Sequence, residues 1–235
     1  MVIAVDGPAG SGKSTIAKLL AERLTDREGN GFSYINSGKL YRAITFGCLR
    51  AKIDPNNGEK VLEFAKNANI AYQNDRVVLD GTDVTDNLHT DEIDRWAAPL
   101  SANVPVRHVV NGFIRRIAEG LNIVVEGRDM TTVVFPDAEH RFYLDASVDS
   151  RAQRRFEQGV SQLSLEDIKT AIIRRDEVDR NKAEGSLFIA PDVWYIDTSY
   201  LTINEVYDIL EDKIAGKSET RIKHGTDGSG IAINR

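Results

Sequence analysis

A phosphate-binding pattern lies close to the N-terminus, between Gly7 and Ser14. Glycines let a backbone curl until successive N–H groups point into one concavity that suits phosphate oxygens. A helix that begins there aims the positive end of its dipole at the same place. Lys13 can then reach the β- and γ-phosphates of a nucleotide, and the Ser14 hydroxyl is the expected Mg²⁺ ligand. The residues predicted to bind the triphosphate are Gly7, Pro8, Ala9, Gly10, Ser11, Gly12, Lys13, Ser14 and Thr15.

The flanks of this stretch distinguish a nucleotide site from a glycine-rich turn that binds nothing. A phosphate-binding loop needs a strand before it and a helix after it. Val2 to Val5 is a short apolar run, and apolar residues recur at helical spacing between Thr15 and Leu24. We therefore interpret the stretch as a nucleotide-binding loop of the P-loop type.

Arginines are the candidates for a second anion site. A kinase whose acceptor is itself phosphorylated must neutralise the acceptor phosphate, and the guanidinium group is always charged and grips phosphate through two N–H groups. The chain is acidic, with a formal net charge of −6, so such a site must be a local cluster. The candidates are Arg42, Arg107, Arg128, Arg151, Arg154, Arg155 and Arg175.

A basic–acidic–basic stripe is predicted near the end of one helix. Arg175, Asp179 and Lys182 would share a face if that helix persists far enough. The stripe could grip a phosphate and a ribose together, or it could be a solvated, salt-bridged face. Spacing alone favours neither alternative.

Composition limits the class of protein. At 235 residues the chain fits one domain with an inserted piece or two small domains, and 41% hydrophobic and 28% charged residues are ordinary for a globular protein. The negative net charge gives no bulk attraction to nucleic acid or membrane, so we expect neither partner. The single cysteine, Cys48, is expected to be buried, and without a leader or a membrane-length apolar run we expect a cytoplasmic protein.

Predicted strands and helices alternate along the chain, which is typical of an α/β fold with a mainly parallel sheet. Ser37 is predicted to cap the second helix, and the spacing of Thr202 and Glu205 predicts a capping box. Predicted strands are 2–5, 32–35, 122–127, 141–145 and 194–197, small β-strands with tight turns are predicted within 69–87, and predicted helices are 15–24, 37–50, 59–67, 91–100, 104–119, 147–158, 164–179 and 203–210.

Four stretches together resemble bacterial cytidylate kinase, within the P-loop nucleoside monophosphate kinases. They are Gly7–Thr15, Asn36–Arg42, Glu126–Pro136 and Arg175–Asn181, in the order of that family from Val2 to about Leu210. The resemblance implies a P-loop three-layer fold with a small β-rich nucleotide-binding insert and a short lid. It also implies transfer of the γ-phosphoryl group of ATP to CMP or dCMP, with Mg²⁺ as cofactor. The implied division is one kinase domain at 1–215, with a core at 1–68 and 104–215, a CMP-binding insert at about 69–103, a lid at about 151–165, and a flexible tail at 216–235.

The resemblance also implies a role for each site residue. Arg107 and Asp129 would read cytosine, because a carboxylate accepts from the exocyclic amino group while an arginine donates to N3 or O2, and uracil reverses that pattern. Lys13, Arg128, Arg151 and Arg155 would be catalytic, with Arg154 beside them at the lid. CMP would be bound by Ser37, Arg42, Arg107, Arg128, Asp129, Arg175, Asp179 and Lys182, in a monomer.

Several positions depart from the family pattern. Asn36 stands where an acidic residue is usual, and Thr131 replaces a usual glycine. Ala98 occupies the place of a serine that commonly helps to bind the base, and Lys182 that of an arginine. These changes bear mainly on base selectivity.

Two other functions are weighed against this one. Another small-molecule P-loop kinase, acting on UMP, AMP, shikimate or dephospho-coenzyme A, would share the loop but not explain the β-rich insert. A GTP-binding switch would need an Asn-Lys-x-Asp motif after a strand, whereas Asn181 to Glu184 ends in glutamate and follows a predicted helix. A metal enzyme or nucleophilic hydrolase finds no support, because the four histidines do not cluster with other ligands.

Overall fold

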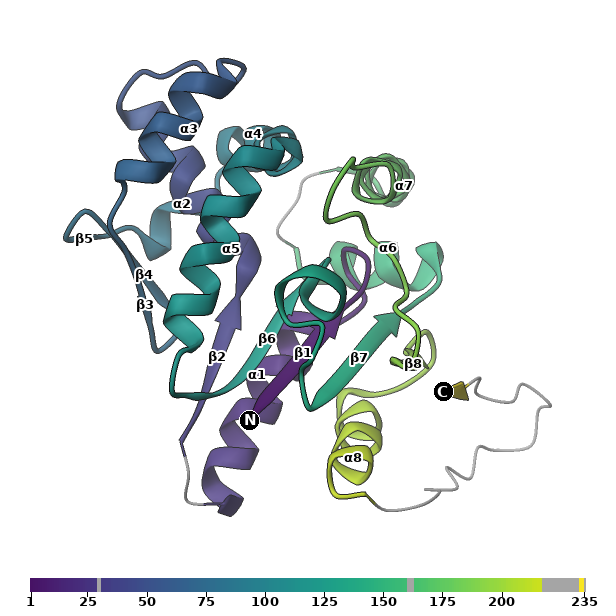
Figure 1. Cartoon of the computed structure of the whole chain (residues 1–235). Coiled ribbons are helices and arrows are strands. Elements are labelled where there is room, and N and C mark those ends of the chain that lie inside the picture. Colours follow the sequence, from purple (N-terminus) through teal and green to yellow (C-terminus); the bar gives the residue numbers. More distant parts are fainter. Residues whose placement is uncertain (29–30, 160–162, 217–232, 235) are drawn as a thin grey trace.

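A computed structural model describes residues 1–28, 31–159, 163–216 and 233–234, and its centre is a twisted sheet (Figure 1). The strand order is β2-β6-β1-β7-β8-β9, and the first five strands are parallel. The strands are β1 (Val2–Asp6), β2 (Phe32–Asn36), β6 (Asn122–Gly127), β7 (His140–Asp145), β8 (Trp194–Asp197) and β9 (Ile233–Asn234). This confirms the predicted α/β fold with a mainly parallel sheet.

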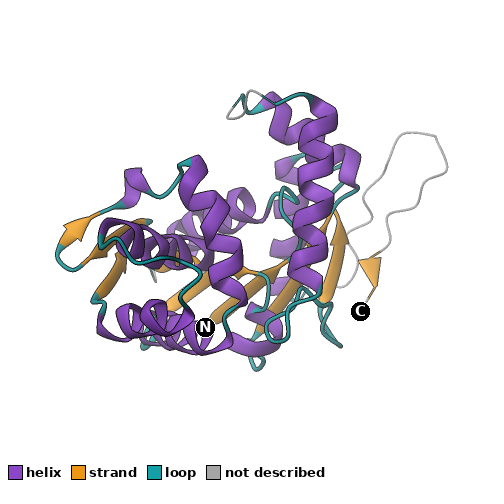
Figure 2. Cartoon of the chain, turned by 90° about the horizontal axis from the view of Figure 1, so that it is seen from above, coloured by secondary structure: helices purple, strands orange, loops and turns teal. Residues whose placement is uncertain are grey.

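Helices cover both faces of this sheet (Figure 2). Side chains of β1 alternate between the two faces: Ile3 and Val5 pack in a core with α1 and α8, and Ala4 packs in a second core with α2 and α5. The helices are α1 (Lys13–Glu28), α2 (Ser37–Arg50), α3 (Gly58–Asn67), α4 (Asp91–Ala102), α5 (Val104–Ala118), α6 (Val148–Glu157), α7 (Leu165–Arg180) and α8 (Ile203–Ile214). In the described part of the chain, no helix combines the length and apolarity that crossing a membrane requires.

A second, antiparallel sheet lies beside α2 and α5. It consists of β3 (Ile70–Gln73), β4 (Arg76–Leu79) and β5 (Thr82–Asp83), followed by a short 3₁₀ turn at Thr85–Asn87. Asn74 and Asp75 join β3 to β4 with φ of 51° and 62°, as a tight hairpin turn requires. The small strands predicted within 69–87 are confirmed, whereas the insert boundaries remain a prediction.

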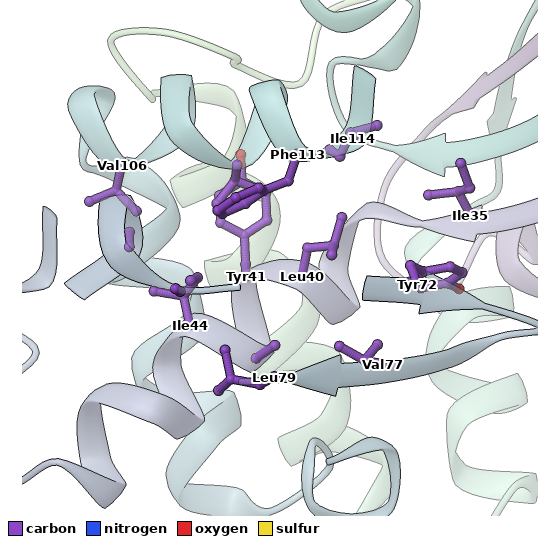
Figure 3. Packing of buried hydrophobic residues seen from close by; sticks show 14 of the residues in the cluster. Ile35, Leu40, Tyr41, Ile44, Tyr72, Val77, Leu79, Val106, Phe113 and Ile114 are labelled. Atoms are coloured by element: carbon purple, nitrogen blue, oxygen red, sulfur yellow. The ribbon is translucent and has the colours of Figure 1, made fainter. Parts of the chain in front are cut away.

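The small sheet does not have a core of its own. Tyr72, Val77 and Leu79 pack in the same buried cluster as Leu40 and Ile44 of α2 (Figure 3). This cluster continues to Ile35 and Val125 of the main sheet. The small sheet is therefore held by the same apolar packing that holds α2 against the strands.

Three local predictions need correction. Helix α1 continues to Glu28 rather than ending near Leu24, because the Thr25 hydroxyl donates to the Ala21 carbonyl over 2.8 Å and accepts from the Phe32 N–H. The cap of α2 is Asn36, whose side chain accepts from the Lys39 N–H, so Ser37 is the first helical residue and not the cap.

The third correction concerns the chain after Gly216, for which the sequence predicts no regular structure. Ile233–Asn234 forms β9, which pairs antiparallel with β8, while residues 217–232 and 235 lie outside the described residues. Before this segment, the predicted capping box of Thr202 and Glu205 is confirmed at the start of α8.

Candidate active site

A cleft of about 230 Å³ opens at the carboxyl ends of the parallel strands, where ligands bind in open α/β sheets. In Figure 1 the arrows of β2 and β7 point to the end of the molecule where α4 and α7 lie. Residues of the P-loop, of the ends of β2 and β6, and of α2, α4, α5, α6 and α7 line the cleft. The lining residues are Ala9, Gly10, Lys13, Ser14, Asn36, Ser37, Gly38, Tyr41, Arg42, Ala97, Ala98, Ser101, Arg107, Glu126, Gly127, Arg128, Asp129, Arg155, Arg175, Asp179 and Lys182.

The P-loop between β1 and α1 has the conformation that its glycines allow. Gly7 has a φ of 148°, and a Cβ there would collide with the carbonyl oxygen of Leu144 in β7. Lys13 is 4% exposed, and its ammonium group donates to the Pro8 carbonyl over 2.6 Å. Burial, and after it the positive charge of Arg128, lowers the pKa of Lys13 to about 7. The ammonium is thus held inside the loop, close to where phosphate oxygens would take over its hydrogen bonds.

Glu126 is a site residue that the motif analysis did not select. The Ser14 hydroxyl donates to its Oε1 over 2.7 Å, and the Tyr34 hydroxyl approaches the same atom at 3.4 Å. Glu126 is 4% exposed at the end of an otherwise apolar strand, and an acidic residue in such a buried run is the sequence signal that could have revealed it. The amide of Asn36 donates to the Tyr34 oxygen over 3.2 Å, which an aspartate at this position could not do.

The Ser14 and Glu126 oxygens suit Mg²⁺, which prefers oxygen ligands and in P-loop enzymes is held by the loop Ser/Thr and an acidic residue at a strand end. No set of three or more histidine, cysteine or carboxylate side chains forms a self-sufficient metal cage anywhere in the described ranges. The donor set therefore fits a Mg²⁺ ion that is shared with nucleotide phosphates.

Arg107 and Asp129, which both line the cleft, form a buried ion pair. Both are 2% exposed, and the Arg107 guanidinium also donates to the Ser101 carbonyl over 2.8 Å. Its charge lies 5.6 Å from the centre of the Tyr41 ring. Burial raises the pKa of Asp129 above its ordinary value, which the neighbouring Arg107 partly offsets.

Asp179 links two cations on the α7 side of the cleft. Its carboxylate accepts from Arg128 over 2.9 Å and from Lys182 over 2.6 Å. Arg128 and Lys182 hold the pKa of Asp179 well below its ordinary value despite burial. Asp179 is 3% exposed and α7 ends at Arg180, so this stripe is a buried cluster rather than a solvated face.

Arg42 and Arg175 bring two further positive charges to this part of the cleft. Arg42 pairs with Asp94 of α4 over 3.0 Å. Burial, and after it the charge of Arg128, lowers the pKa of Arg175 to about 10. Within the described residues, the buried Nε of Arg175 has no hydrogen-bond partner. A buried donor with a free N–H, lying among several cations, is suited to an anion that accepts its hydrogen bond.

The three arginines of α6 do not act as one face. Only Arg155 lines the cleft. Arg151 is 2% exposed and lies behind the P-loop, where it donates to the Ala9 carbonyl over 3.1 Å and pairs with Asp176 of α7 over 2.7 Å. Arg154 donates to Thr198 after β8. Although the three arginines share one face of α6, their side chains are long enough to reach different partners. The predicted lid at 151–165 includes residues 160–162, which lie outside the described residues.

Comparison with known proteins shows the family of the chain. The cytidylate kinase family model matches residues 3–215. The cytidylate kinase of Borrelia hermsii is 41% identical over 89% of this chain and 96% of its own. That of Thermodesulfovibrio yellowstonii is 42% identical over 91% of this chain and 97% of its own.

Among solved structures, an uncharacterized protein from Eubacterium ventriosum superposes with a TM-score of 0.51 at 14% identity. The match covers 92% of this chain and 99% of that one, which shows a common fold and no more. Family model, full-length relatives and cleft thus point to the same group of enzymes. The chain belongs to the cytidylate kinase family.

Proposed function

We propose that the cleft carries out the reaction of this family with the P-loop as donor site and the Arg107–Asp129 end as acceptor site. A cytidylate kinase transfers the γ-phosphoryl group of ATP to CMP or dCMP and yields ADP with CDP or dCDP. The observation that carries the assignment is that one cleft joins the phosphate-binding loop to a buried Arg–Asp pair through a row of arginines.

The cytosine ring of the acceptor would meet Arg107 and Asp129. The Asp129 carboxylate accepts from the exocyclic amino group, and Arg107 donates to N3 or O2. Tyr41 and Ala98 line the same end of the cleft and offer the ring an apolar surface. Ala98 brings no hydroxyl, so the Arg107–Asp129 pair supplies the charged contacts to the base, with the Ser101 hydroxyl nearby in the lining of the cleft.

The acceptor phosphate would lie among Ser37, Arg42, Arg128 and Arg175. Arg175 then finds a partner for its Nε, and the crowding of positive charge is relieved. Asp179 and Lys182 hold the ribose side and keep Arg128 in place.

Phosphoryl transfer requires little covalent chemistry from the protein. An oxygen of the acceptor phosphate attacks the γ-phosphorus of ATP, the new P–O bond forms, and the bond from the γ-phosphorus to the bridging oxygen breaks to release ADP. Lys13 and Arg155 neutralise the charge that spreads over the transferred group. Arg151 would support this step indirectly, because it donates to the Ala9 carbonyl and so holds the P-loop backbone in place.

Ser14 and Glu126 would hold Mg²⁺, which would supply positive charge to the nucleotide phosphates. We further propose a monomer, and a cytoplasmic enzyme, since the one cysteine is a buried free thiol.

A coupled assay of ADP release tests this function. With MgATP, the enzyme should turn over CMP and dCMP, and turnover with UMP, AMP and shikimate should be lower. Asp129→Ala should reduce the preference for CMP over UMP by about tenfold or more, because the site loses its acceptor for the amino group. An unchanged preference would remove Asp129 from the base-reading role, and comparable turnover of AMP would favour a different nucleotide kinase.

A further inference from the structure

The carboxylate of Asp6 is a fully buried group that the phosphoryl transfer does not use. Asp6 ends β1, directly before Gly7 of the P-loop, and its exposed fraction is 0%. It accepts three hydrogen bonds from the chain after β6: the Met130 N–H at 2.9 Å, the Thr131 N–H at 2.7 Å and the Thr131 hydroxyl at 2.6 Å. All three bonds bridge more than a hundred residues of sequence.

These donors belong to the first turn of a short π-helical segment, Met130–Val134. The first N–H groups of any helical segment lack partners within it, and the residue at the N-cap commonly supplies one from its side chain. Asp129 occupies that N-cap position, and aspartate is a preferred cap. Its side chain nevertheless makes no capping hydrogen bond and pairs with Arg107 instead.

We propose that Asp6 and Thr131 are a positioning pair that caps this turn in place of Asp129 and so leaves the Asp129 carboxylate free for the acceptor base. The inference rests on the proposed base-reading role of Asp129. Without this cap, Asp129 at the N-cap position could itself serve the N–H groups of the turn, and its carboxylate would then turn away from Arg107.

Thr131 contributes something that the usual glycine could not. A glycine would offer Asp6 its N–H alone, whereas Thr131 adds a hydroxyl donor in a site that is 0% exposed. The hydroxyl also bears on the charge of Asp6. Burial and the nearby negative charge of Asp129 raise the pKa of Asp6 to about 6, and the bonds from Thr131 and Met130 oppose this rise. The other charged or titratable groups that face Asp6 are Lys13, Arg128 and Tyr143.

Thr131→Val tests the hydroxyl, since valine keeps the volume and removes the donor. We expect KM for CMP to rise about tenfold, the low end for a lost bond to a charged group because the two backbone bonds remain. The preference for CMP over UMP should fall with it, whereas KM for ATP and the affinity for ADP should stay unchanged. Thr131→Ser should restore the KM for CMP.

Thr132→Val is the matched control. Thr132 lies in the same turn, and its buried hydroxyl oxygen has no hydrogen-bond partner among the residues that the structure describes. Removal of that hydroxyl should leave KM for CMP unchanged. An equal rise in Thr132→Val would attribute the effect to general loosening of the turn and overturn the proposal.

A double-mutant comparison separates this proposal from the base-reading role on which it rests. If Asp129→Ala alone leaves the preference for CMP unchanged, the base-reading role fails. If Asp129→Ala removes the preference, Thr131→Val should have no further effect in the Asp129→Ala background. An undiminished effect there, or none in either background, would show that Thr131 does not act through Asp129.

The pH dependence of kcat/KM in Thr131→Ala provides a second test of the proposal. The hydroxyl bond lowers the pKa of Asp6, so its removal should move the acid limb of kcat/KM for CMP to higher pH and leave that for ATP in place. An acid limb that stays in place would contradict the proposal. Loss of the folded state in both Thr131→Val and Thr131→Ala, seen by circular dichroism, would assign the hydroxyl to stability alone and overturn it.

Discussion

The two ends of the cleft differ in how their charges are balanced. At the base end, Arg107 and Asp129 neutralise each other, and both are almost completely buried. At the phosphate end, burial and neighbouring cations lower the pKa of Lys13 to about 7 and that of Arg175 to about 10. In the proposed roles, the Arg107–Asp129 pair is balanced within itself, whereas Lys13 and Arg175 lie among other cations and would gain most from a bound anion. The Arg107–Asp129 pair is therefore preorganised for the base, whereas Lys13 and Arg175 would attract phosphate mainly by their charge.

We expect the largest loss of activity when Lys13 is replaced. Lys13→Met should lower kcat by about a thousandfold or more, because the transferred group loses a cation that no neighbouring residue replaces. The coupled assay measures this loss, and circular dichroism confirms that the fold is retained. Near-normal turnover would contradict the assignment of the donor site.

The thermal stability of Lys13→Met tests whether the buried charge of Lys13 destabilises the folded protein. Lys13 has a pKa of 10.5 when exposed and about 7 in the folded protein, so between these values the unfolded chain binds more protons and stability rises with pH. At pH 7 and below, the buried lysine therefore costs stability. Lys13→Met should melt at a higher temperature than the parent at pH 7, by about 2–4 °C for each 1 kcal/mol gained.

Next in size is the loss of Asp179. Asp179→Asn leaves two buried cations, Arg128 and Lys182, without their common carboxylate, which costs about 3–5 kcal/mol in comparable sites. Asp129→Asn, which strands only Arg107, should cost less in urea denaturation at pH 7. Because the folded-state pKa of Asp179 is depressed, its contribution is present above the ordinary value of 3.8 and lost as the pH falls through the folded value. Equal losses for the two variants would mean that the two ends do not differ in charge balance.

The next prediction concerns the uptake of a proton when nucleotide binds. When nucleotide phosphates bind beside Lys13, they favour its charged form, so binding of ADP at pH 8 should take up nearly one proton. Calorimetry in buffers of different ionisation enthalpy measures this uptake. In Lys13→Met it should disappear, and an undiminished uptake there would assign the proton to another group.

The smallest expected effect is at Asn36. Asn36→Asp keeps the cap of α2 but loses the donation to Tyr34 and adds a negative charge near Glu126. We expect a change in kcat of at most about twofold to threefold, within the range of a mild polar substitution. The Mg²⁺ concentration for half-maximal activity should fall slightly. A large loss of activity would show that the neutral amide has a catalytic function.

Local signals in the sequence were sufficient for most elements of the fold. The glycines of the P-loop, the hairpin turn at Asn74–Asp75 and the capping box at Thr202 act through neighbours in the chain, and their geometry follows from residue type. The cap of α2 was assigned one residue too late, because Asn36 and Ser37 are both good caps and only the observed backbone distinguishes them.

Partners that are distant in the sequence were not predictable in the same way. The family resemblance implies one site for Arg107, Asp129 and Arg175, but it does not predict how charge is balanced among them. Arg151 shares a helix face with Arg155, yet its guanidinium turns to Ala9, 142 residues away in the sequence. Such contacts depend on the tertiary arrangement of long side chains, which periodicity does not encode.

The shared core of the small sheet has a consequence for engineering substrate specificity. Tyr72, Val77 and Leu79 complete the apolar packing of α2, so removal of residues 69–103 would expose Leu40 and Ile44 to water. A chimera that exchanges only this segment between kinases would join two surfaces that were never fitted to each other. The transplantable unit is larger and comprises α2, α3, the small sheet and α4 together. A change of acceptor specificity by exchange must therefore replace part of the scaffold along with the site.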